Sequence, residues 1–247
     1  MPRAGLSTAV VVGTAAELAD EAGWDQLTLA AVAARLSVRQ PSLYKHIGSL
    51  AELRRAVSVL AVTEIGDRLV VAVAGRSGVD ALTHLAIAYR GYAHRHPGRY
   101  AASVIAPAPG DREHTRVADG VLRTLAAVLR GYGFPDIAGN VVREVERAGD
   151  DEVGAPGDAP AGDTIDGGKG DGPASASPAD TLHAIRGLRA MLHGFVALEA
   201  AGGFGMPLDL DVSYRRLVAG LDAALTRQGA GAGPSGEHDR ATTVVGL

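Results

Sequence analysis

The sequence predicts an all-α protein, and three observations lead to this expectation. Hydrophobic residues make up 47% of the 247 residues but aromatic residues only 4%, so the core must be built largely from alanine, valine and leucine. Alanine-rich stretches with few β-branched clusters favour helix over strand. Apolar residues also recur at the spacing of one helix face, and residues that cap helices precede several of these runs.

The expected helices begin at recognisable signals. Ser7 or Thr8 is the expected N-cap of the first helix. Thr28 and Ser49 are the expected N-caps of the second and fourth, because their hydroxyls accept a bond from a first-turn amide. Pro41 lies in the first turn of the third helix, where its missing amide hydrogen costs little. In chain order, the predicted helices cover residues 8–22, 28–36, 40–46, 49–74, 78–95, 98–106, 111–132, 135–148, 181–202 and 211–227.

An acidic segment interrupts the helical pattern. Residues 149–180 hold eight acidic residues and one lysine, and are otherwise mostly Gly, Ala, Pro and Ser. Such a segment cannot bury enough apolar surface to offset its ordering entropy, so residues 149–179 are expected to form a disordered acidic loop. The whole chain has a net charge of −4, whereas the chain without this segment has +3. The total charge therefore does not argue against a nucleic-acid partner.

Several classes of protein are disfavoured. Cysteine is absent, which excludes disulfides, thiolate catalysis and cysteine-based zinc sites, and suits a reducing compartment. No apolar run approaches the roughly 20 residues that cross a membrane, and the N-terminus lacks the apolar region of a signal peptide. We therefore expect a soluble, cytoplasmic protein without a membrane partner.

Catalytic, cofactor and metal sites are not expected either. The glycine-rich residues 167–170 lack the first glycine and the closing Ser/Thr of a phosphate loop. No G-x-S-x-G motif of a hydrolase is present. His94 and His96 are two residues apart and so do not share a helix face, which argues against a metal site. The prediction is a protein that is not an enzyme.

Residues 28–46 combine two short predicted helices, a turn and a cluster of polar side chains. Two helices joined by about three residues form the helix-turn-helix pattern. The second helix carries groups that bond base edges in the major groove, since arginine pairs with guanine and glutamine with adenine. Lysine and histidine suit phosphate oxygens, and no acidic residue lies between Asp25 and Glu52. These properties favour a helix face that contacts double-stranded DNA over a helix face that is only exposed to solvent.

Residues 10–53 resemble the DNA-binding part of the TetR family of bacterial transcriptional regulators. The resemblance rests on Gly23 after the first helix, the pair Leu27-Thr28, the segment Val32-Ala33-Ala34-Arg35-Leu36 and the ending Leu43-Tyr44-Lys45-His46. The DNA-contacting set that it implies comprises Thr28, Tyr44, Lys45, His46 and Ser49 at the backbone, and Arg39, Gln40, Pro41 and Ser42 at the major groove. Ser37 departs from the glycine usual in the family, and Leu50 from a phosphate-binding lysine.

The C-terminal half resembles a TetR subgroup named for a Trp-His-Gly motif, which here reads Leu192-His193-Gly194. The resemblance implies that this region builds a dimer. Small residues spaced three and four apart between 187 and 201 permit close helix–helix approach, in agreement with that role. The candidate dimer-interface residues are Gly187, Ala190, Met191, Gly194, Ala197, Leu198, Leu217 and Leu221.

A small-molecule ligand bound among the C-terminal helices is also implied by the resemblance. Its candidate contacts are aromatic and histidine side chains, each of which is alternatively part of the core. They are Tyr89, Tyr92, His96, Tyr100, Phe134 and His193. For His193, the other interpretation is a histidine near the dimer interface whose ring nitrogens are hydrogen-bonded within the protein.

The favoured hypothesis is a homodimeric repressor on a pseudo-palindromic operator, released by a small ligand. Residues 1–48 would be the helix-turn-helix domain, residues 49–228 the ligand-binding and dimerisation domain, and residues 229–247 a flexible tail. The alternative is a helical small-molecule binding protein without operator-specific DNA binding, which Leu50 and the net negative charge would favour. Whether the protein represses or activates transcription is left open by the sequence.

Overall fold

The structure is a computed structural model that describes residues 6–137 and 177–230. Within those ranges every regular element is a helix, which confirms the all-α prediction. The elements are α1 (Thr8–Ala22), η1 (Trp24–Gln26), α2 (Leu29–Arg35), η2 (Gln40–Lys45), α3 (Leu50–Val73), α4 (Gly78–Arg95), α5 (Pro97–Ser103), α6 (Arg112–Arg130), α8 (Pro178–Ala200) and α9 (Leu210–Ala230), of which η1 and η2 are 3₁₀ helices. Most of the acidic loop, of the helix expected at 135–148 and of the tail lies outside the described residues.

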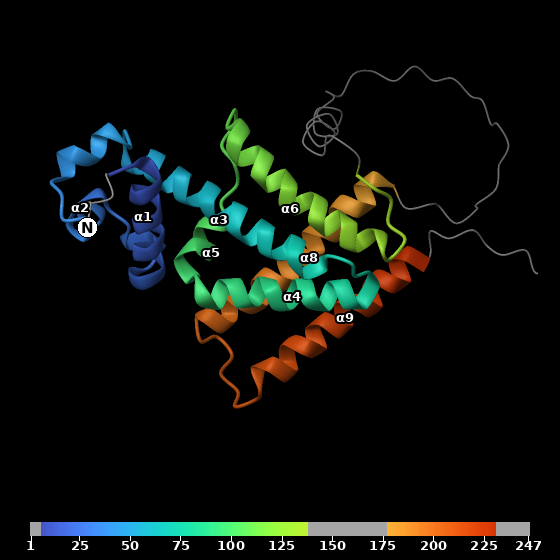
Figure 1. The fold of residues 1–247 in the computed structure, drawn as a ribbon. Helices are drawn as coiled ribbons and strands as arrows, with labels where there is room; N and C mark the ends of the chain where they lie inside the picture. The colour runs from blue at the N-terminus through green and yellow to red at the C-terminus, as the bar shows by residue number, and fades with distance from the viewer. Residues whose placement is uncertain (1–5, 138–176, 231–247) are drawn as a thin grey trace, which may run out of the picture.

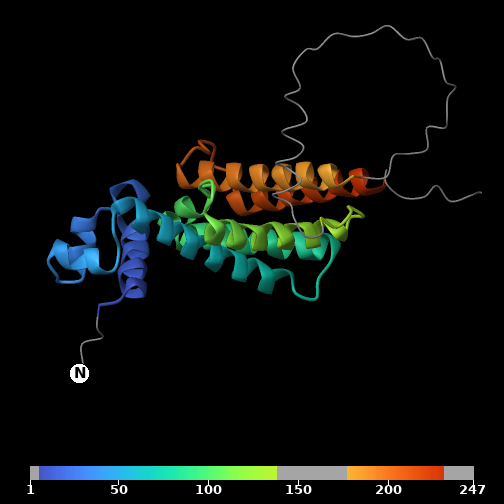
Figure 2. The same ribbon diagram turned by 90° about the horizontal axis from the view of Figure 1, so that it is seen from above.

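The helices form a small N-terminal unit and a larger C-terminal unit. The N-terminal unit contains α1, α2 and η2 and lies at one end of the molecule (Figure 1). The long helix α3 runs out of it, and α4 and α6 pack beside α3. Helices α8 and α9 lie side by side as an outer layer on one side of α3, α4 and α6 (Figure 2). This arrangement leaves one face of the α8–α9 layer uncovered.

Two hydrophobic cores correspond to the two units, and α3 contributes to both. Leu53 and Val57 pack with the side chains of α1 and α2 in the smaller core. Ile65 and Leu69, farther along α3, pack with α4, α6, α8 and α9 in the larger core. The two units therefore share one continuous helix rather than being joined by a linker, and a displacement of α3 moves both.

Helix starts follow the expected hydroxyl caps. Ser7 rather than Thr8 caps α1, where its hydroxyl accepts from the Val10 amide at 3.3 Å. Ser49 caps α3, but the Glu52 carboxylate accepts from the Gly48 amide at 2.8 Å, one residue before the expected capping-box partner.

The start of α8 lies three residues earlier than predicted. Ser177 and Asp180 form a reciprocal capping box there, and Pro178 occupies the first turn. The pairing holds the pKa of Asp180 below its ordinary value, because the Ser177 amide and hydroxyl both donate to its carboxylate. A hydroxyl–carboxylate pair at the right spacing thus nucleates the helix before its first buried residue.

Direct backbone contact joins the N-terminal unit to α5. A Cβ atom on Gly98 would lie 2.0 Å from the Ala19 carbonyl oxygen, so only glycine permits this approach of α5 to α1. The Asp20 carboxylate accepts from the Arg99 amide at 2.8 Å and pairs with His96 at 3.1 Å. The end of α1 is therefore held against the start of α5 by packing and by charge together.

Candidate nucleic-acid interface and ligand cavity

The third predicted helix is a tight 3₁₀ helix, η2. The Ser42 amide donates to the Arg39 carbonyl at 2.9 Å, and the His46 amide donates to the Leu43 carbonyl at 2.8 Å. Leu43 is fully buried and anchors η2 on the smaller core. Because 3₁₀ hydrogen bonds connect residues three apart, one buried anchor leaves most neighbouring side chains facing outward. The exposed side chains are those of Arg39, Gln40, Pro41, Tyr44 and Lys45, while Ser42 and His46 are half-buried.

The turn between α2 and η2 is a Schellman motif with serine in the left-handed position. Ser37 has φ of 55°, and its amide donates to the Ala34 carbonyl at 3.0 Å. The Val38 amide donates to the Ala33 carbonyl at 3.0 Å, which completes the motif. A side chain in this conformation costs roughly 1 kcal/mol relative to glycine. The motif sets the angle at which η2 leaves α2.

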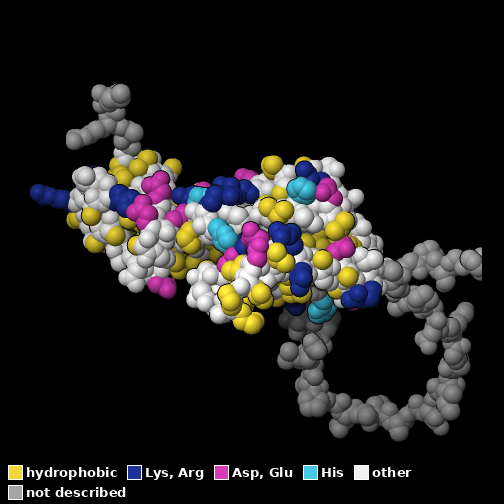
Figure 3. Space-filling view, turned by 90° about the horizontal axis from the view of Figure 1, so that it is seen from below, with side chains coloured by type: hydrophobic (Ala, Val, Ile, Leu, Met, Phe, Trp, Pro, Cys, Tyr) yellow, Lys and Arg dark blue, Asp and Glu magenta, His cyan; other side chains and the backbone are white. Residues whose placement is uncertain are grey.

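Positive charge on this unit is concentrated at η2. Arg35 is not part of it, because both of its terminal nitrogens bind the Glu21 carboxylate on α1. That contact also lowers the pKa of Glu21. In the described ranges, neither Arg39 nor Lys45 has an ion-pair partner. Figure 3 shows a Lys or Arg side chain projecting from the outer end of the N-terminal unit.

The predicted backbone-contacting residues surround η2. The Thr28 hydroxyl accepts from the Ala31 amide at 3.2 Å, and its own hydrogen is left to donate. Ser49 caps α3 in the same way, at 3.0 Å. Tyr44 is 51% exposed, and the Gln40 side-chain amide donates to its hydroxyl at 3.4 Å. The predicted backbone-contacting residues therefore lie on η2 and at the N-termini of α2 and α3.

Comparison with known proteins decides the family. A family model described as bacterial regulatory proteins, tetR family, matches residues 11–57. A second, described as a tetracyclin repressor-like C-terminal domain, matches residues 82–221. This chain belongs to the TetR family. It is accordingly a DNA-binding transcriptional regulator with a helix-turn-helix, and the family is one of regulators rather than enzymes.

Two curated relatives match this chain over different lengths. YobS of Bacillus subtilis (strain 168), an uncharacterized HTH-type transcriptional regulator, is 30% identical over 224 residues, which cover 89% of this chain and 95% of YobS. Rv0681 of Mycobacterium tuberculosis (strain ATCC 25618 / H37Rv), also an uncharacterized HTH-type regulator, is 44% identical over 130 residues, which cover 52% of this chain and 60% of Rv0681.

Solved structures share the fold. A TetR variant from Acinetobacter baumannii AYE, in complex with minocycline, has a TM-score of 0.56 at 19% identity and covers 91% of this chain and 98% of its own. At that identity the likeness concerns the fold alone. In the described part of the chain, no helix combines the length and the apolar character that crossing a membrane requires.

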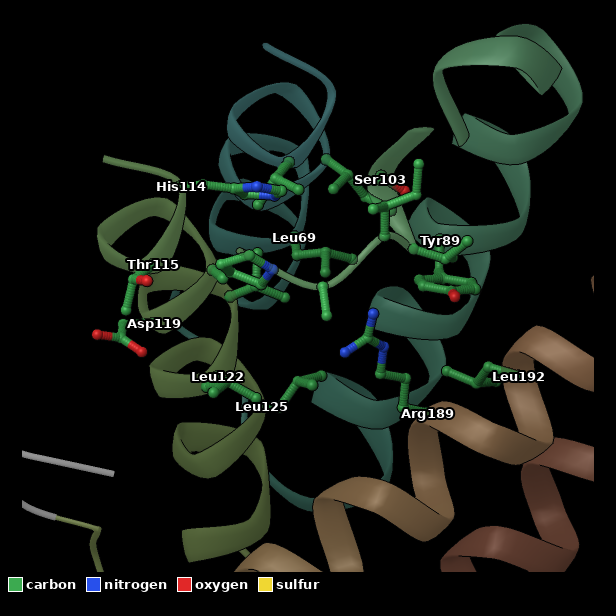
Figure 4. A pocket seen from close by; sticks show the side chains of 18 of the residues that line it. Leu69, Tyr89, Ser103, His114, Thr115, Asp119, Leu122, Leu125, Arg189 and Leu192 are labelled. Atoms are coloured by element: carbon green, nitrogen blue, oxygen red, sulfur yellow. The ribbon is translucent and has the colours of Figure 1, made fainter. Parts of the chain in front are cut away.

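A cavity of about 510 Å³ lies inside the C-terminal unit of this TetR-family protein. Side chains of α3, α4, α6 and α8 line it, together with residues 103–110 after α5 (Figure 4). Most of the lining is aliphatic, and the polar groups are few. They are Tyr89, Ser103, His114, Thr115, Asp119 and Arg189. Its size and mostly apolar lining are typical of a small-molecule site.

Among the six predicted ligand contacts, Tyr89 alone lines this cavity. Tyr92 is fully buried, and its hydroxyl donates to the Glu64 carboxylate at 3.1 Å instead. His96 pairs with Asp20, and Phe134 packs in the larger core. These three side chains therefore lie outside the cavity, and their role in ligand binding stays a prediction. Tyr100 and His193 lie directly behind Tyr89.

A hydrogen-bonded chain connects the cavity to α8. The Tyr89 and Tyr100 hydroxyls are 3.0 Å apart, and the Tyr100 hydroxyl lies 2.6 Å from His193 Nδ1. Burial raises the pKa of both tyrosines, so both are neutral at ordinary pH. The polar end of the cavity therefore continues, through two hydroxyls, to a histidine near the outer face of α8.

Sequence reasoning missed His114 and Arg189. His114 is 3% exposed, and its Nε2 atom has no hydrogen-bond partner in the described residues. Burial lowers its pKa, although Asp111 opposes that effect, so the ring is neutral at pH 7. Neither residue belongs to a motif, and their helices come together only in the fold. No sequence signal could have paired them.

The uncovered face of α8 carries most of the predicted dimer residues. Met191 is 43% exposed and Leu198 50% exposed, while Gly187, Ala190 and Ala197 are exposed as well. Gly194 and Leu217 are half-buried. Leu221 is the exception, because it is 4% exposed and packs in the larger core. It therefore presents little surface of its own to a partner, and its place in the interface stays a prediction.

Proposed function

We propose that this protein is a homodimeric repressor that binds a pseudo-palindromic operator through η2 and is released by a small molecule held in the cavity. The observation that carries the proposal is η2 itself. It presents Arg39, Gln40 and Lys45 outward from a helix-turn-helix that Leu43 anchors, in a stretch of sequence with no acidic residue between positions 25 and 52. In this proposal Arg39 and Gln40 read base edges, and Tyr44, Lys45 and the start of α3 contact phosphates.

The two copies pair through α8 and α9. Small residues on the uncovered face of α8 allow close approach, and Met191 and Leu198 supply apolar area that would otherwise face water. Two η2 elements then contact successive major grooves about 34–36 Å apart. Support for the alternative, a binding protein without operator specificity, is limited to Leu50 and the net charge.

Ligand release depends on coupling between the cavity and η2. Helix α3 lines the cavity and also packs in the smaller core, so a ligand that favours one position of α3 favours one spacing of the two η2 elements. The A. baumannii relative in complex with minocycline supports a small molecule as the effector. Assignment to the Trp-His-Gly subgroup, and the division of the chain at residue 48, remain predictions.

The proposal is tested with DNA from upstream of the protein's own gene. Fluorescence anisotropy should show sequence-selective binding that weakens steeply as salt rises. Arg39→Ala and Gln40→Ala should each lose about 1–3 kcal/mol of selectivity over random DNA. Arg76→Ala is the matched control, since Arg76 is an exposed arginine at the far end of α3. Selective binding that survives in the double variant Arg39→Ala/Gln40→Ala would show that η2 is not the reading element.

A further inference from the structure

The polar groups of the cavity are distributed unevenly. Arg189 extends from α8 toward the enclosed space, and Tyr89 lies near it on α4 (Figure 4). Asp119 lies at the opposite side of the view, on α6 (Figure 4). Between them the lining is aliphatic, and includes Leu69 and Leu125. The cavity therefore has a cationic side, an apolar middle and a distant acidic edge.

We propose that the cavity binds an amphipathic anion, with a carboxylate against Arg189 and the Tyr89 hydroxyl and an aliphatic body along the apolar middle. The inference rests on the proposed function, in which this cavity holds the releasing ligand. The inference goes beyond the proposed function because it names the chemical class of the ligand.

Arg189 is the first support, because its charge is not used elsewhere in the described structure. The neighbouring Arg90 binds Glu199 and also Asp211, at 2.7 Å in the latter case. By contrast, no acidic side chain within 6–137 or 177–230 pairs with Arg189. The residue remains exposed, so the charged group of the ligand lies at the entrance, where its desolvation is small. Arginine also suits a carboxylate geometrically, through two parallel N–H donors.

Tyr89 is the second support, because the chain behind it can make its hydroxyl a donor. When His193 carries a hydrogen on Nδ1, that hydrogen bonds the Tyr100 oxygen, and Tyr100 donates to Tyr89. The Tyr89 hydrogen is then not used within this chain and is free to bond a ligand. With the hydrogen on Nε2 alone, the whole chain runs in reverse and Tyr89 offers only lone pairs. An anion selects the first arrangement, and therefore favours a hydrogen on Nδ1 of His193.

The apolar middle is the third support. Branched and straight aliphatic side chains of four helices line it, and a volume of about 510 Å³ suits a molecule with an extended hydrocarbon part. His114, with its unpartnered Nε2 atom, also lines the cavity. It offers a hydrogen bond to any hydroxyl or carbonyl on the ligand's body after a small adjustment of the ring.

Three ten-carbon probes test the charge preference on the full-length protein. Decanoate, 1-decanol and decylamine share one tail and differ only in the head group. Isothermal titration calorimetry at pH 7.5 should show decanoate binding about tenfold more tightly than decanol, as expected for a charge-assisted bond at a partly exposed site, with decylamine weakest. Equal or tighter binding of decanol or decylamine, or no binding by any probe, would overturn the proposal.

Substitutions locate the head group. Arg189→Gln should weaken decanoate about tenfold and leave decanol unchanged. Arg186→Gln is the matched control, because Arg186 is exposed on the same helix and does not line the cavity. Tyr89→Phe should weaken decanoate more than decanol, since it removes the hydroxyl that donates to the carboxylate, and retained decanol binding shows that the fold survives. Equal losses for Arg186→Gln and Arg189→Gln would contradict the inference.

Operator binding, measured in parallel, separates the two proposals. If decanoate binds as expected but does not change the anisotropy of bound operator DNA, ligand release is wrong and the cavity inference stands. If operator DNA binds selectively while decanoate shows no preference over decanol, the regulator stands and the ligand chemistry proposed here is wrong.

Discussion

Replacing Gly98 with alanine tests how the N-terminal unit is held in place. The new Cβ would lie 2.0 Å from the Ala19 carbonyl oxygen, 2.1 Å from its carbon and 2.6 Å from the Asp20 amide nitrogen. Real Cβ atoms essentially never approach another atom closer than 3.0 Å, so α1 and α5 must separate by about 1 Å. Backbone atoms cannot rotate away as a side chain could, which makes the whole helix α1 move.

The expected cost is that of overpacking, about 1–3 kcal/mol of unfolding free energy. Separation of the helices also lengthens the contacts of Asp20 with His96 and with the Arg99 amide. Because α1 forms part of the scaffold of η2, operator affinity should fall by more than the loss of folded protein explains. Urea unfolding followed by circular dichroism gives the first quantity, and fluorescence anisotropy with operator DNA the second.

Gly13→Ala is the matched control for Gly98→Ala. Gly13 lies inside α1, and a Cβ there meets no atom within 4 Å. Alanine should therefore stabilise the protein by about 0.5–1 kcal/mol, through lower chain entropy in the unfolded state. The reasoning fails if Gly98→Ala has the unfolding free energy and the operator affinity of the wild type. It also fails if Gly98→Ala and Gly13→Ala lose the same amount of unfolding free energy.

Three further predictions follow from other contacts. Ser37→Gly should raise the unfolding free energy by about 1 kcal/mol by relieving the left-handed backbone, whereas Ser37→Ala should not; equal urea midpoints for the two would contradict this. Gly194→Glu should yield monomers in analytical ultracentrifugation because it charges the face of α8, while Val71→Glu on α3 should not, and a persistent Gly194→Glu dimer would place the interface elsewhere. Arg55 holds the pKa of Asp111 at about 2, mainly by hydrogen bonding, so stability present above pH 4 is lost as pH falls toward 2. In Arg55→Gln, the urea midpoint should fall less between pH 4 and pH 2 than it does in the wild type. An unchanged decrease would show that Arg55 does not lower the pKa of Asp111.

Local signals made the helices and the helix-turn-helix predictable. The hydroxyl caps at Ser7, Thr28 and Ser49 act within one turn of sequence, so their spacing alone indicates where a helix starts. Helix α4 runs from Gly78 to Arg95, as predicted, because Pro97 ends the helical pattern of apolar residues shortly after it. The exposed residues of η2 were predictable for the same reason. Leu43 is the single large aliphatic residue in η2 and is the one that is buried, which leaves its polar neighbours exposed.

Errors arose where a local pattern had two possible partners. The Glu52 carboxylate, three residues after the Ser49 cap, accepts from the Gly48 amide rather than from the Ser49 amide, and local spacing does not distinguish these two neighbours. Leu217 and Leu221 both belong to the apolar stripe of α9. The sequence does not show that Leu221 lies on the buried edge of this stripe and Leu217 on the more exposed edge. The Tyr92 hydroxyl bonds Glu64, 28 residues away, a pairing that no local pattern indicates.

By itself, the sequence determined the all-α class, the helix boundaries to within a few residues and which residues of η2 are exposed, because each depends on interactions between residues a few positions apart. The tertiary structure decided the cavity, its cationic side and the contact of α5 with α1. Arg189 and Tyr89 are 100 positions apart, and Gly98 is essential only because Ala19 lies against it. Such pairings depend on how the helices pack, and no local spacing encodes them.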